Sequence, residues 1–317
     1  MNSIWLIGAG SIAVEHAKVM AALDVDFTVI GRGEESAQEF RKTTGLSVET
    51  GGLAKALENR TFPQVAVLAL PVANLADAAL SLIAAGVQHL LIEKPGSLSI
   101  ESLKDIRESA LASGCLVSIA YNRRFYESTR ELSQMINVDG GVTSVFFEFN
   151  EPKRIMESDY YPEEVRRRWF LANSTHVVDL VFHLCGHPTE WRSWSSGALT
   201  GHLTSSRFAG AGELDSGALF SYLSDWEAPG RWGIEITTVN HRLILRPMEK
   251  LHLMRHGSFD VEEVDIDDSL DVDFKPGFFR QMEAFLNEGQ SQLCSIDEHI
   301  RNMGIYYTIA NYSPRIS

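Results

Sequence analysis

The sequence predicts an α/β protein in which a doubly wound parallel sheet is followed by an α+β region with an open, largely antiparallel sheet. Up to about residue 120, short apolar runs alternate with helix-like segments, a pattern typical of parallel strands joined by crossover helices. After Tyr121 the strand signals become longer and richer in aromatic residues. The length of 317 residues is about twice the usual domain size and favours two domains, 1–120 and 121–317.

The period of the apolar residues predicts each element in turn. In the first domain the expected strands are Ser3–Ile7, Phe27–Ile30, Val65–Leu70, Leu90–Ile92 and Leu116–Ala120, and the expected helices are Ile12–Leu23, Glu34–Thr43, Leu53–Glu58, Ala73–Ala85 and Ile100–Ser113. In the second domain the expected strands are Gly141–Phe149, Gly217–Asp225, Trp232–Thr238 and Arg242–Arg246, and the expected helices are Thr175–Cys185, Gly277–Asn287 and Ile296–Ala310.

Composition and charge exclude several classes of protein. The apolar runs are too short to cross a bilayer, and no signal peptide is visible, so we expect a soluble cytoplasmic protein that does not bind membranes. The net charge of −14 argues against nucleic acid as a partner. The three cysteines have no paired spacing and fit reduced, buried thiols. The acidic segment 260–273 is interpreted as a solvated edge strand and loop rather than a cation site.

A glycine turn gives the first functional signal. The segment Gly8-Ala9-Gly10-Ser11-Ile12-Ala13 joins the first expected strand to the first helix as G-x-G-x-x-A. Gly8 permits the tight turn, Gly10 allows a pyrophosphate to approach, and Ala13 allows close packing of helix and strand. The helix N-terminus then offers unpaired N–H groups to the phosphates. We therefore predict a dinucleotide-binding Rossmann domain with Gly8, Gly10, Ser11 and Ile12 at the cofactor; the alternative is a structural glycine turn in another α/β fold.

The end of the second strand bears on the choice of cofactor. An acid usually stands there to bind the adenosine ribose of NAD, but here the strand runs into Gly31-Arg32-Gly33, with Ser36 nearby. A guanidinium suits a 2′-phosphate because its planar fork can pair two oxygens. We expect Arg32 to favour NADP over NAD. An exposed loop arginine, or one stacked on adenine, would leave both cofactors open.

A family resemblance begins at Glu93-Lys94-Pro95, directly after the strand Leu90–Ile92. Together with other motifs in order along the chain, this tripeptide resembles the Gfo/Idh/MocA oxidoreductases, the family of glucose–fructose oxidoreductase and inositol dehydrogenase. The other motifs are the N-terminal glycine turn, Pro71, Ala85-Gly86-Val87-Gln88-His89, Tyr121-Asn122-Arg123-Arg124-Phe125 and Thr175-His176-Val177-Val178-Asp179.

The resemblance implies hydride transfer between nicotinamide and a hydroxyl-bearing carbon of a sugar, sugar acid or nucleotide sugar. It places Lys94 and His176 beside the reacting carbon as catalytic residues, and we expect Pro71, Glu93 and Lys94 to contact the cofactor. It also implies a second domain whose open sheet often serves oligomer contacts, which predicts a homodimer or homotetramer.

Further residues are candidates for the substrate. Clustered guanidiniums, including Arg123 and Arg168, could bind an anionic group of the substrate, or could form a solvated or oligomer-facing basic strip. Asn122 and Asn173 are expected to contact the substrate. Asp179 shares a helical face with His176 and could orient its imidazole. The same face also carries His183, which raises zinc as an alternative, but one helix rarely supplies all the ligands, so we expect no metal.

Two positions depart from the family pattern. Many members carry an aspartate four residues before the histidine, where this sequence has Ala172, and a histidine where it has Leu75. Ala172 shifts the acid–base role to Lys94 and His176. It also motivates an alternative function, a catalytically inactive NAD(P)-binding regulatory protein of the same fold. A third possibility is a reductase for an imine or a conjugated pigment, which would not require His176.

Overall fold

The computed structural model describes residues 4–58, 62–158, 160–287 and 292–312, so Ser3 of the first expected strand lies outside the described residues. The chain divides into two compact units. The first unit takes in the described parts of 1–122 and 273–301, and the second takes in those of 123–272 and 302–312. A single boundary after residue 120 does not capture this division, because residues 273–301 return to the first unit.

The first unit is built on a mostly parallel sheet, as the alternation of short apolar runs predicts. Its strands are β1 (Ile4–Ile7), β2 (Phe27–Ile30), β3 (Val65–Leu68), β4 (His89–Glu93), β5 (Leu116–Ala120) and β14 (Cys294–Ser295). They lie in the order β14-β5-β4-β3-β1-β2, and only β14 runs antiparallel to its neighbour. Leu6, Val67 and Leu91 on the central strands have no exposed surface, as expected for a parallel sheet covered on both faces.

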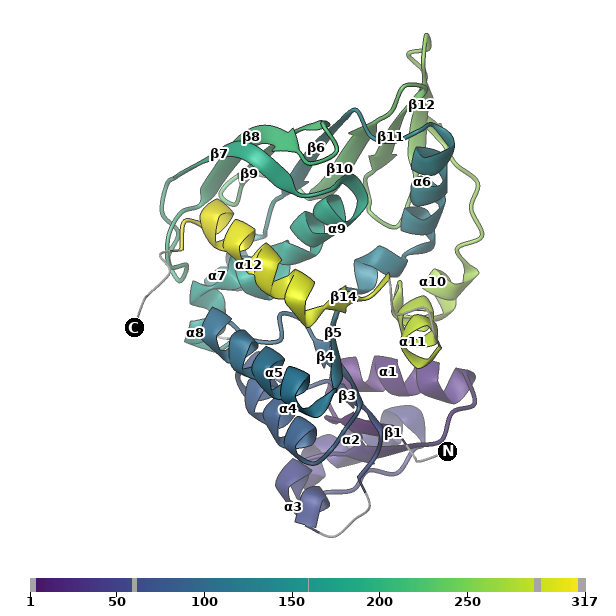
Figure 1. Ribbon diagram of the computed structural model, residues 1–317, viewed down its shortest axis with the longest axis vertical. Coiled ribbons are helices and arrows are strands. Elements are labelled where there is room, and N and C mark those ends of the chain that lie inside the picture. Colours follow the sequence, from purple (N-terminus) through teal and green to yellow (C-terminus); the bar gives the residue numbers. More distant parts are fainter. Residues whose placement is uncertain (1–3, 59–61, 159, 288–291, 313–317) are drawn as a thin grey trace. The chain divides into compact units, whose positions relative to one another are not determined.

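Helices cover both faces of this sheet. They are α1 (Ser11–Ala22), α2 (Glu34–Thr44), α3 (Gly52–Glu58), α4 (Leu75–Ala84), α5 (Ile100–Ser113) and α11 (Phe278–Leu286), while α12 (Ile296–Ala310) continues into the second unit. The pair α4 and α5 packs together on one side, and α1 packs against α11 on the other (Figure 1). The strand order reverses between β1 and β3, and ligands bind at such a switch point, outside the carboxyl ends of the strands.

The second unit carries a large sheet that is antiparallel except for the pair β6 and β9. Its strands are β6 (Ser144–Phe149), β7 (Pro188–Ser196), β8 (Arg207–Leu214), β9 (Leu219–Asp225), β10 (Trp232–Thr237), β11 (His241–Leu245), β12 (His252–Arg255) and β13 (Glu262–Glu263). They lie in the order β13-β12-β11-β10-β6-β9-β8-β7. The open, largely antiparallel sheet expected after Tyr121 is therefore confirmed.

One face of this sheet is buried beneath a helix. The helices of the second unit are α6 (Glu127–Val138), α7 (Lys153–Met156), α8 (Glu163–Arg167), α9 (Thr175–Cys185) and α10 (Ser269–Asp273). Helix α9 packs on β6 and β10, and its Phe182 meets Phe147 and Phe220 edge to face with ring centroids 6.1 Å and 5.8 Å away. This apolar packing holds α9, which carries His176 in its first turn, against the sheet.

The acidic segment, two of the cysteines and the length of the helices bear on the expectations drawn from composition. The acidic segment contributes the edge strand β13, and Glu262 and Glu263 are exposed, which confirms the solvated-edge interpretation. Cys115 and Cys185 are free and buried, and burial raises the pKa of their thiols to about 11 and about 12. Within the described residues, no helix has both the length and the apolar character needed to span a membrane.

A buried histidine in the second unit makes stability depend on pH. His202 Nδ1 lies 3.0 Å from the carbonyl oxygen of Ser205, and its Nε2 lies 2.7 Å from the hydroxyl of Tyr312. A carbonyl only accepts, so Nδ1 carries the proton and Nε2 accepts from Tyr312 in the neutral ring. Burial, opposed by the bond to Ser205, lowers the pKa of His202 to about 4.

The folded protein should therefore lose stability in acid. Above the unfolded pKa of about 6.5 His202 is neutral in both states, and between there and about pH 4 only the unfolded state takes up the proton. We expect this group to lower the free energy of unfolding by about 2–3 kcal/mol between about pH 7 and pH 4.5. Denaturant unfolding of wild type and His202→Gln at both pH values measures this. The fall in the free energy of unfolding on acidification should be smaller in His202→Gln by that amount, and an identical fall in both proteins would contradict the assignment.

Candidate active site

A groove of about 1110 Å³ opens where β1 and β3 end. Its walls come from the turn after β1, the segment after β2, the start of α3 and the segment after β3. Six of the eight expected cofactor residues line it, namely Gly8, Gly10, Ser11, Ile12, Arg32 and Pro71. The groove therefore lies at the switch point of the strand order, where the fold leaves room for a ligand.

The two turn glycines have different reasons to be glycine. Gly8 has φ +128°, and a Cβ there would lie 2.1 Å from the carbonyl oxygen of Ala69, so no larger residue fits between β1 and β3. Gly10 has an ordinary φ of −89°, and a Cβ there would meet no described atom within 4 Å. Gly10 thus leaves open space at the N-terminus of α1, and among the described residues no side chain caps that helix. Such bare amides fit a diphosphate.

Lys94 stands at the carboxyl end of β4. Glu93 is the last residue of that strand, the Lys94–Pro95 peptide is cis, and the Gly96 amide donates to the Glu93 carbonyl at 2.9 Å. Lys94 and Glu93 are both half-buried, and neither belongs to the described lining of the groove. The lysine ammonium therefore sits on a tight turn at the same end of the sheet as the glycine turn.

His176 in the second unit lies beside an indole ring. It is the second residue of α9 and is 5% exposed, and its ring centroid lies 6.0 Å from that of Trp232 on β10. The guanidinium carbon of Arg123 lies 4.5 Å from the centroid of Trp232, a cation–π contact. His176, Trp232 and Arg123 therefore form one group, which combines an imidazole, an aromatic surface and a positive charge. Trp226 is instead fully buried and donates to the Phe149 carbonyl, a packing role.

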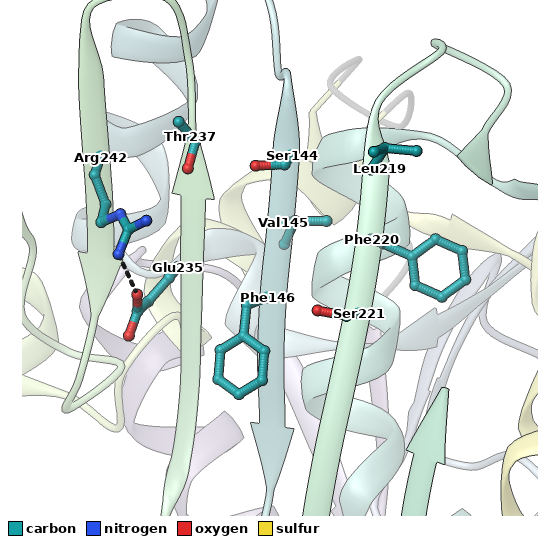
Figure 2. Close-up of a pocket in the computed structure, with 9 residues that line it drawn as sticks. All are labelled: Ser144, Val145, Phe146, Leu219, Phe220, Ser221, Glu235, Thr237 and Arg242. Atoms are coloured by element: carbon teal, nitrogen blue, oxygen red, sulfur yellow. Dashed lines mark ion pairs between the residues drawn. The ribbon is translucent and has the colours of Figure 1, made fainter. Parts of the chain in front are cut away.

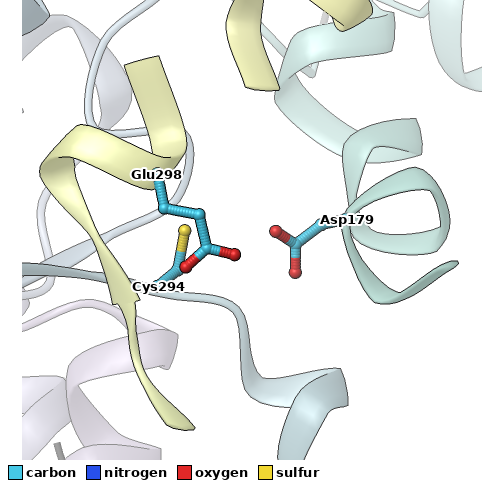
Figure 3. A group of neighbouring side chains, drawn as sticks. All are labelled: Asp179, Cys294 and Glu298. Carbon is cyan, nitrogen blue, oxygen red and sulfur yellow. The ribbon is translucent and has the colours of Figure 1, made fainter. Parts of the chain in front are cut away.

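Asp179 on α9 forms an ion pair with Arg124. Figure 3 shows it projecting from α9, while Cys294 lies on β14 and Glu298 on the first turn of α12. The two carboxylate oxygens of Asp179 accept from Nε and Nη2 of Arg124 at 2.8 Å and 2.7 Å, and both side chains are 1% exposed. Asp179 therefore makes a buried, bidentate ion pair with Arg124. The expectation that it also contacts the substrate stays a prediction.

Two asparagines expected at the substrate also serve the protein itself. The Asn122 amide donates to the Pro276 carbonyl at 2.9 Å, which ties the end of β5 to the segment before α11. The Asn173 amide donates to both oxygens of Glu151, at 2.9 Å and 3.1 Å. These contacts give both side chains a structural function that the sequence reasoning did not foresee.

Glu151 is a buried carboxylate that the sequence reasoning missed. It follows β6, is 4% exposed, and accepts a further bond of 2.7 Å from the Ser174 hydroxyl. Asn173 and Ser174 end a turn of π-helix, Phe170–Ser174, that leads directly into α9. Such turns are rare and frequently mark functional sites. No spacing or motif marks Glu151 in the sequence, because its partners lie more than twenty positions away.

The two residues before Arg168 contact other parts of the protein. Arg167 pairs with exposed Glu163 at 3.4 Å, and Arg166 donates to the Met156 carbonyl at 3.4 Å. The expectation that Arg123 and Arg168 bind an anionic group of the substrate stays a prediction.

Residues 3–121 match the family described as "Oxidoreductase family, NAD-binding Rossmann fold", GFO_IDH_MocA. The first domain is therefore similar to the Gfo/Idh/MocA oxidoreductases. This match coincides with the sheet, the glycine turn and the Glu93-Lys94-Pro95 segment described above, and it confirms the resemblance drawn from those residues. No curated protein matches the sequence.

Solved structures of similar fold cover nearly the whole chain. The UDP-N-acetylglucosamine 3-dehydrogenase of Acidithiobacillus ferrooxidans is 17% identical, with a TM-score of 0.77 over 99% of this chain and 98% of that one. A putative NADPH-dependent oxidoreductase of Desulfitobacterium hafniense is 16% identical, with a TM-score of 0.80 over 98% and 95%. The WlbA dehydrogenase of Bordetella pertussis, in complex with NADH and UDP-GlcNAcA, is 16% identical, with a TM-score of 0.73 over 99% and 97%.

Proposed function

We propose that this protein is a nicotinamide-dependent dehydrogenase or reductase acting on a hydroxyl-bearing carbon of a sugar, sugar acid or nucleotide sugar. The observation that carries the proposal is the glycine-turn groove in a unit whose strand β4 ends at Glu93, one residue before Lys94. A bound nicotinamide would supply or accept the hydride. The protein's own residues must then bind the dinucleotide and move the hydroxyl proton.

The residues divide these tasks. The amides at Gly10, Ser11 and Ile12 would hold the diphosphate at the N-terminus of α1. Lys94 exchanges a proton with the substrate hydroxyl, and His176 is the second acid–base group. Both assignments follow from the chemistry of these side chains and from the resemblance.

The second unit offers means of recognising a sugar. The half-buried ring of Trp232 beside His176 suits stacking on a pyranose, and the guanidinium of Arg123 suits a carboxylate or phosphate. A sugar acid or nucleotide sugar provides both features. The WlbA dehydrogenase, which has a similar fold and was solved in complex with UDP-GlcNAcA, supports this choice.

We further propose that NADP is preferred over NAD. Arg32, Gly33 and Ser36 line the groove after β2, where the adenosine ribose would lie. The first acid after that strand, Glu34, accepts from Thr50 at 2.6 Å and from Arg41 at 3.1 Å, bonds that lower its pKa, in that order. Glu34 is thus already engaged, whereas the Arg32 side chain is exposed to a ligand.

Reversing the charge at Arg32 tests this preference. We expect Arg32→Asp to raise the Kd for NADP by about 10- to 100-fold, since about 1.5–3 kcal/mol of charge-assisted hydrogen bonding is lost, and to leave the Kd for NAD within about threefold. Glu35→Gln is the matched control, because Glu35 also lines the groove. If the Glu35 carboxylate bound the ribose, this substitution would raise the Kd for NAD and not the Kd for NADP. An unchanged ratio of the two Kd values in Arg32→Asp would overturn the assignment.

We also propose self-association through the open face of the second sheet, as a homodimer or homotetramer. Trp194, Leu219 and Leu223 lie on this face and are 58%, 61% and 59% exposed. The same face carries a groove of about 330 Å³. Among the residues that line it, Figure 2 shows the ion pair of Arg242 and Glu235, which are 3.5 Å apart. Large exposed apolar residues that share one face of an open sheet suit a subunit contact.

The proposed function is tested by titration followed by turnover. The protein is titrated with NADP and NAD, and reduction of the tighter cofactor is then followed across a panel of sugars, sugar acids and nucleotide sugars. Saturable binding together with reduction by at least one member supports the proposal. Failure to bind either dinucleotide would overturn it.

A further inference from the structure

Two buried histidines of the first unit hold the residues on either side of Lys94. His16 on α1 is 1% exposed, and its Nε2 lies 2.9 Å from Oε1 of Glu93. His299 on α12 has no exposed surface, and its Nε2 lies 2.9 Å from the carbonyl oxygen of Pro95. Lys94 is therefore bracketed by one contact before it and one after it, both made by imidazoles from distant parts of the chain.

The chemistry of the acceptors fixes the direction of both bonds. A carbonyl oxygen only accepts, and an ionised carboxylate only accepts, so Nε2 carries a proton in each ring. For His16 the opposite nitrogen, Nδ1, is buried with no hydrogen-bond partner among the described residues, and the Phe278 ring lies 4.7 Å away. The imidazole of His16 therefore has one polar task, which is to donate to Glu93.

Helix α1 links this contact to the cofactor groove. Gly10 at its N-cap borders the groove, and His16 lies about 9 Å further along the same rigid helix at 1.5 Å per residue. The element that would hold the diphosphate thus also holds the turn that carries the lysine. His299 fixes the far side of that turn, and its ring packs against Tyr121 at 5.7 Å.

We propose that His16 and His299 are positioning residues, which hold the Glu93–Pro95 turn so that the Lys94 ammonium meets the substrate hydroxyl in a fixed place. This rests on the proposed function, since it requires Lys94 to act in proton transfer. Small misplacements of a catalytic group cost rate rather than affinity, because the reacting geometry is reached less often. Loss of either donor should therefore lower kcat and leave KM nearly unchanged.

The experiment compares a variant that keeps a donor with one that removes it. The side-chain amide nitrogen of glutamine can reach the place of the histidine Nε2 and donate there. Leucine has no donor, and the side chain of asparagine is too short to bring its amide to that place. We expect His16→Leu to lower kcat by about 10- to 100-fold at unchanged KM and unchanged Kd for the cofactor, and His16→Gln to recover most of the rate. The pair His299→Leu and His299→Gln should behave alike.

Further readouts separate positioning from packing and from failure of the proposed function. Adding His16→Leu to Lys94→Ala should change the residual rate little, because the histidine acts only through the lysine. If His16→Leu fails to fold, by circular dichroism and cofactor titration, His16→Asn replaces it with the same expected loss. A wild-type kcat in the variant lacking the donor, or equal losses in the Leu and Gln variants, would overturn the positioning role. A wild-type rate in Lys94→Ala would instead overturn the proposed function itself.

Discussion

Replacing Lys94 by alanine is expected to lower kcat by about 10²- to 10⁴-fold. The Kd for the cofactor should change far less, because Lys94 is not among the described residues that line the groove and its contact with the cofactor would be one of many. The proton of the substrate hydroxyl would lose its acceptor during oxidation, and the groove that holds the dinucleotide would be untouched. Steady-state rates and a fluorescence titration of the reduced cofactor measure the two effects separately.

Two further variants sharpen this test. Lys94→Arg keeps the positive charge but not the ability to give up a proton at neutral pH, so we expect it to remain slow. Lys104→Ala removes an exposed lysine on α5 and should behave as wild type. A rapid Lys94→Arg variant would show that charge alone matters, and a rapid Lys94→Ala variant would remove Lys94 from the chemistry altogether.

The two glycines of the first turn are expected to fail in different ways. Gly8→Ala forces a Cβ to within 2.1 Å of the Ala69 carbonyl oxygen at a φ of +128°. The added Cβ would meet backbone atoms rather than a flexible side chain, so we expect a loss of more than about 3 kcal/mol in the free energy of unfolding, and no cofactor binding. Thermal and denaturant unfolding of the variant measure this loss.

Gly10→Ala is the matched comparison, because its Cβ meets no described atom and its backbone is unstrained. We expect a change of no more than about 1 kcal/mol in stability. The added methyl group should nevertheless raise the Kd for the dinucleotide by at least about tenfold, since it stands where the diphosphate must approach. Equal affinity in Gly10→Ala and wild type would show that the phosphates bind elsewhere.

The first unit could be predicted closely because its signals are local. Strands such as Phe27–Ile30 and Leu116–Ala120, and the helix Ile100–Ser113, begin and end as the apolar pattern predicts. Buried parallel strands are short apolar runs, and their crossover helices have a clear period. The bounds of helix α9 could also be predicted, because Gly186 follows its last apolar turn.

Two strands of the second sheet were harder to predict, because apolar and polar residues do not alternate regularly along them. Strand β7 alternates between half-exposed and exposed residues, and β8 contains Gly210 and Gly212, so neither shows a strong apolar period. Their pairing with each other and with β9 supplies the order that the sequence does not. Helix α6 was missed for another reason, since it buries polar residues such as Glu127 and Thr129.

In the candidate site, too, the residues in contiguous motifs could be predicted and those that depend on long-range contacts could not. The glycine turn and Lys94 are carried by contiguous motifs and were found from the sequence. Glu151, His16 and His299 depend on partners 22, 77 and 204 positions away, which no local pattern reveals. Helical spacing relates Asp179 to His176, but its ion-pair partner Arg124 lies on another segment, so spacing alone could not reveal that pair.

The most direct test of the account is hydride transfer itself. Wild-type protein saturated with oxidised NADP is mixed with nucleotide-sugar acids, sugar acids and free sugars, and the absorbance of reduced nicotinamide is followed in a single turnover. We predict a burst of reduced cofactor with at least one of these substrates, absent in Lys94→Ala. Tight cofactor binding with no reduction by any member, and no oxidation of reduced cofactor by the corresponding ketones, would contradict the account and favour a regulatory protein.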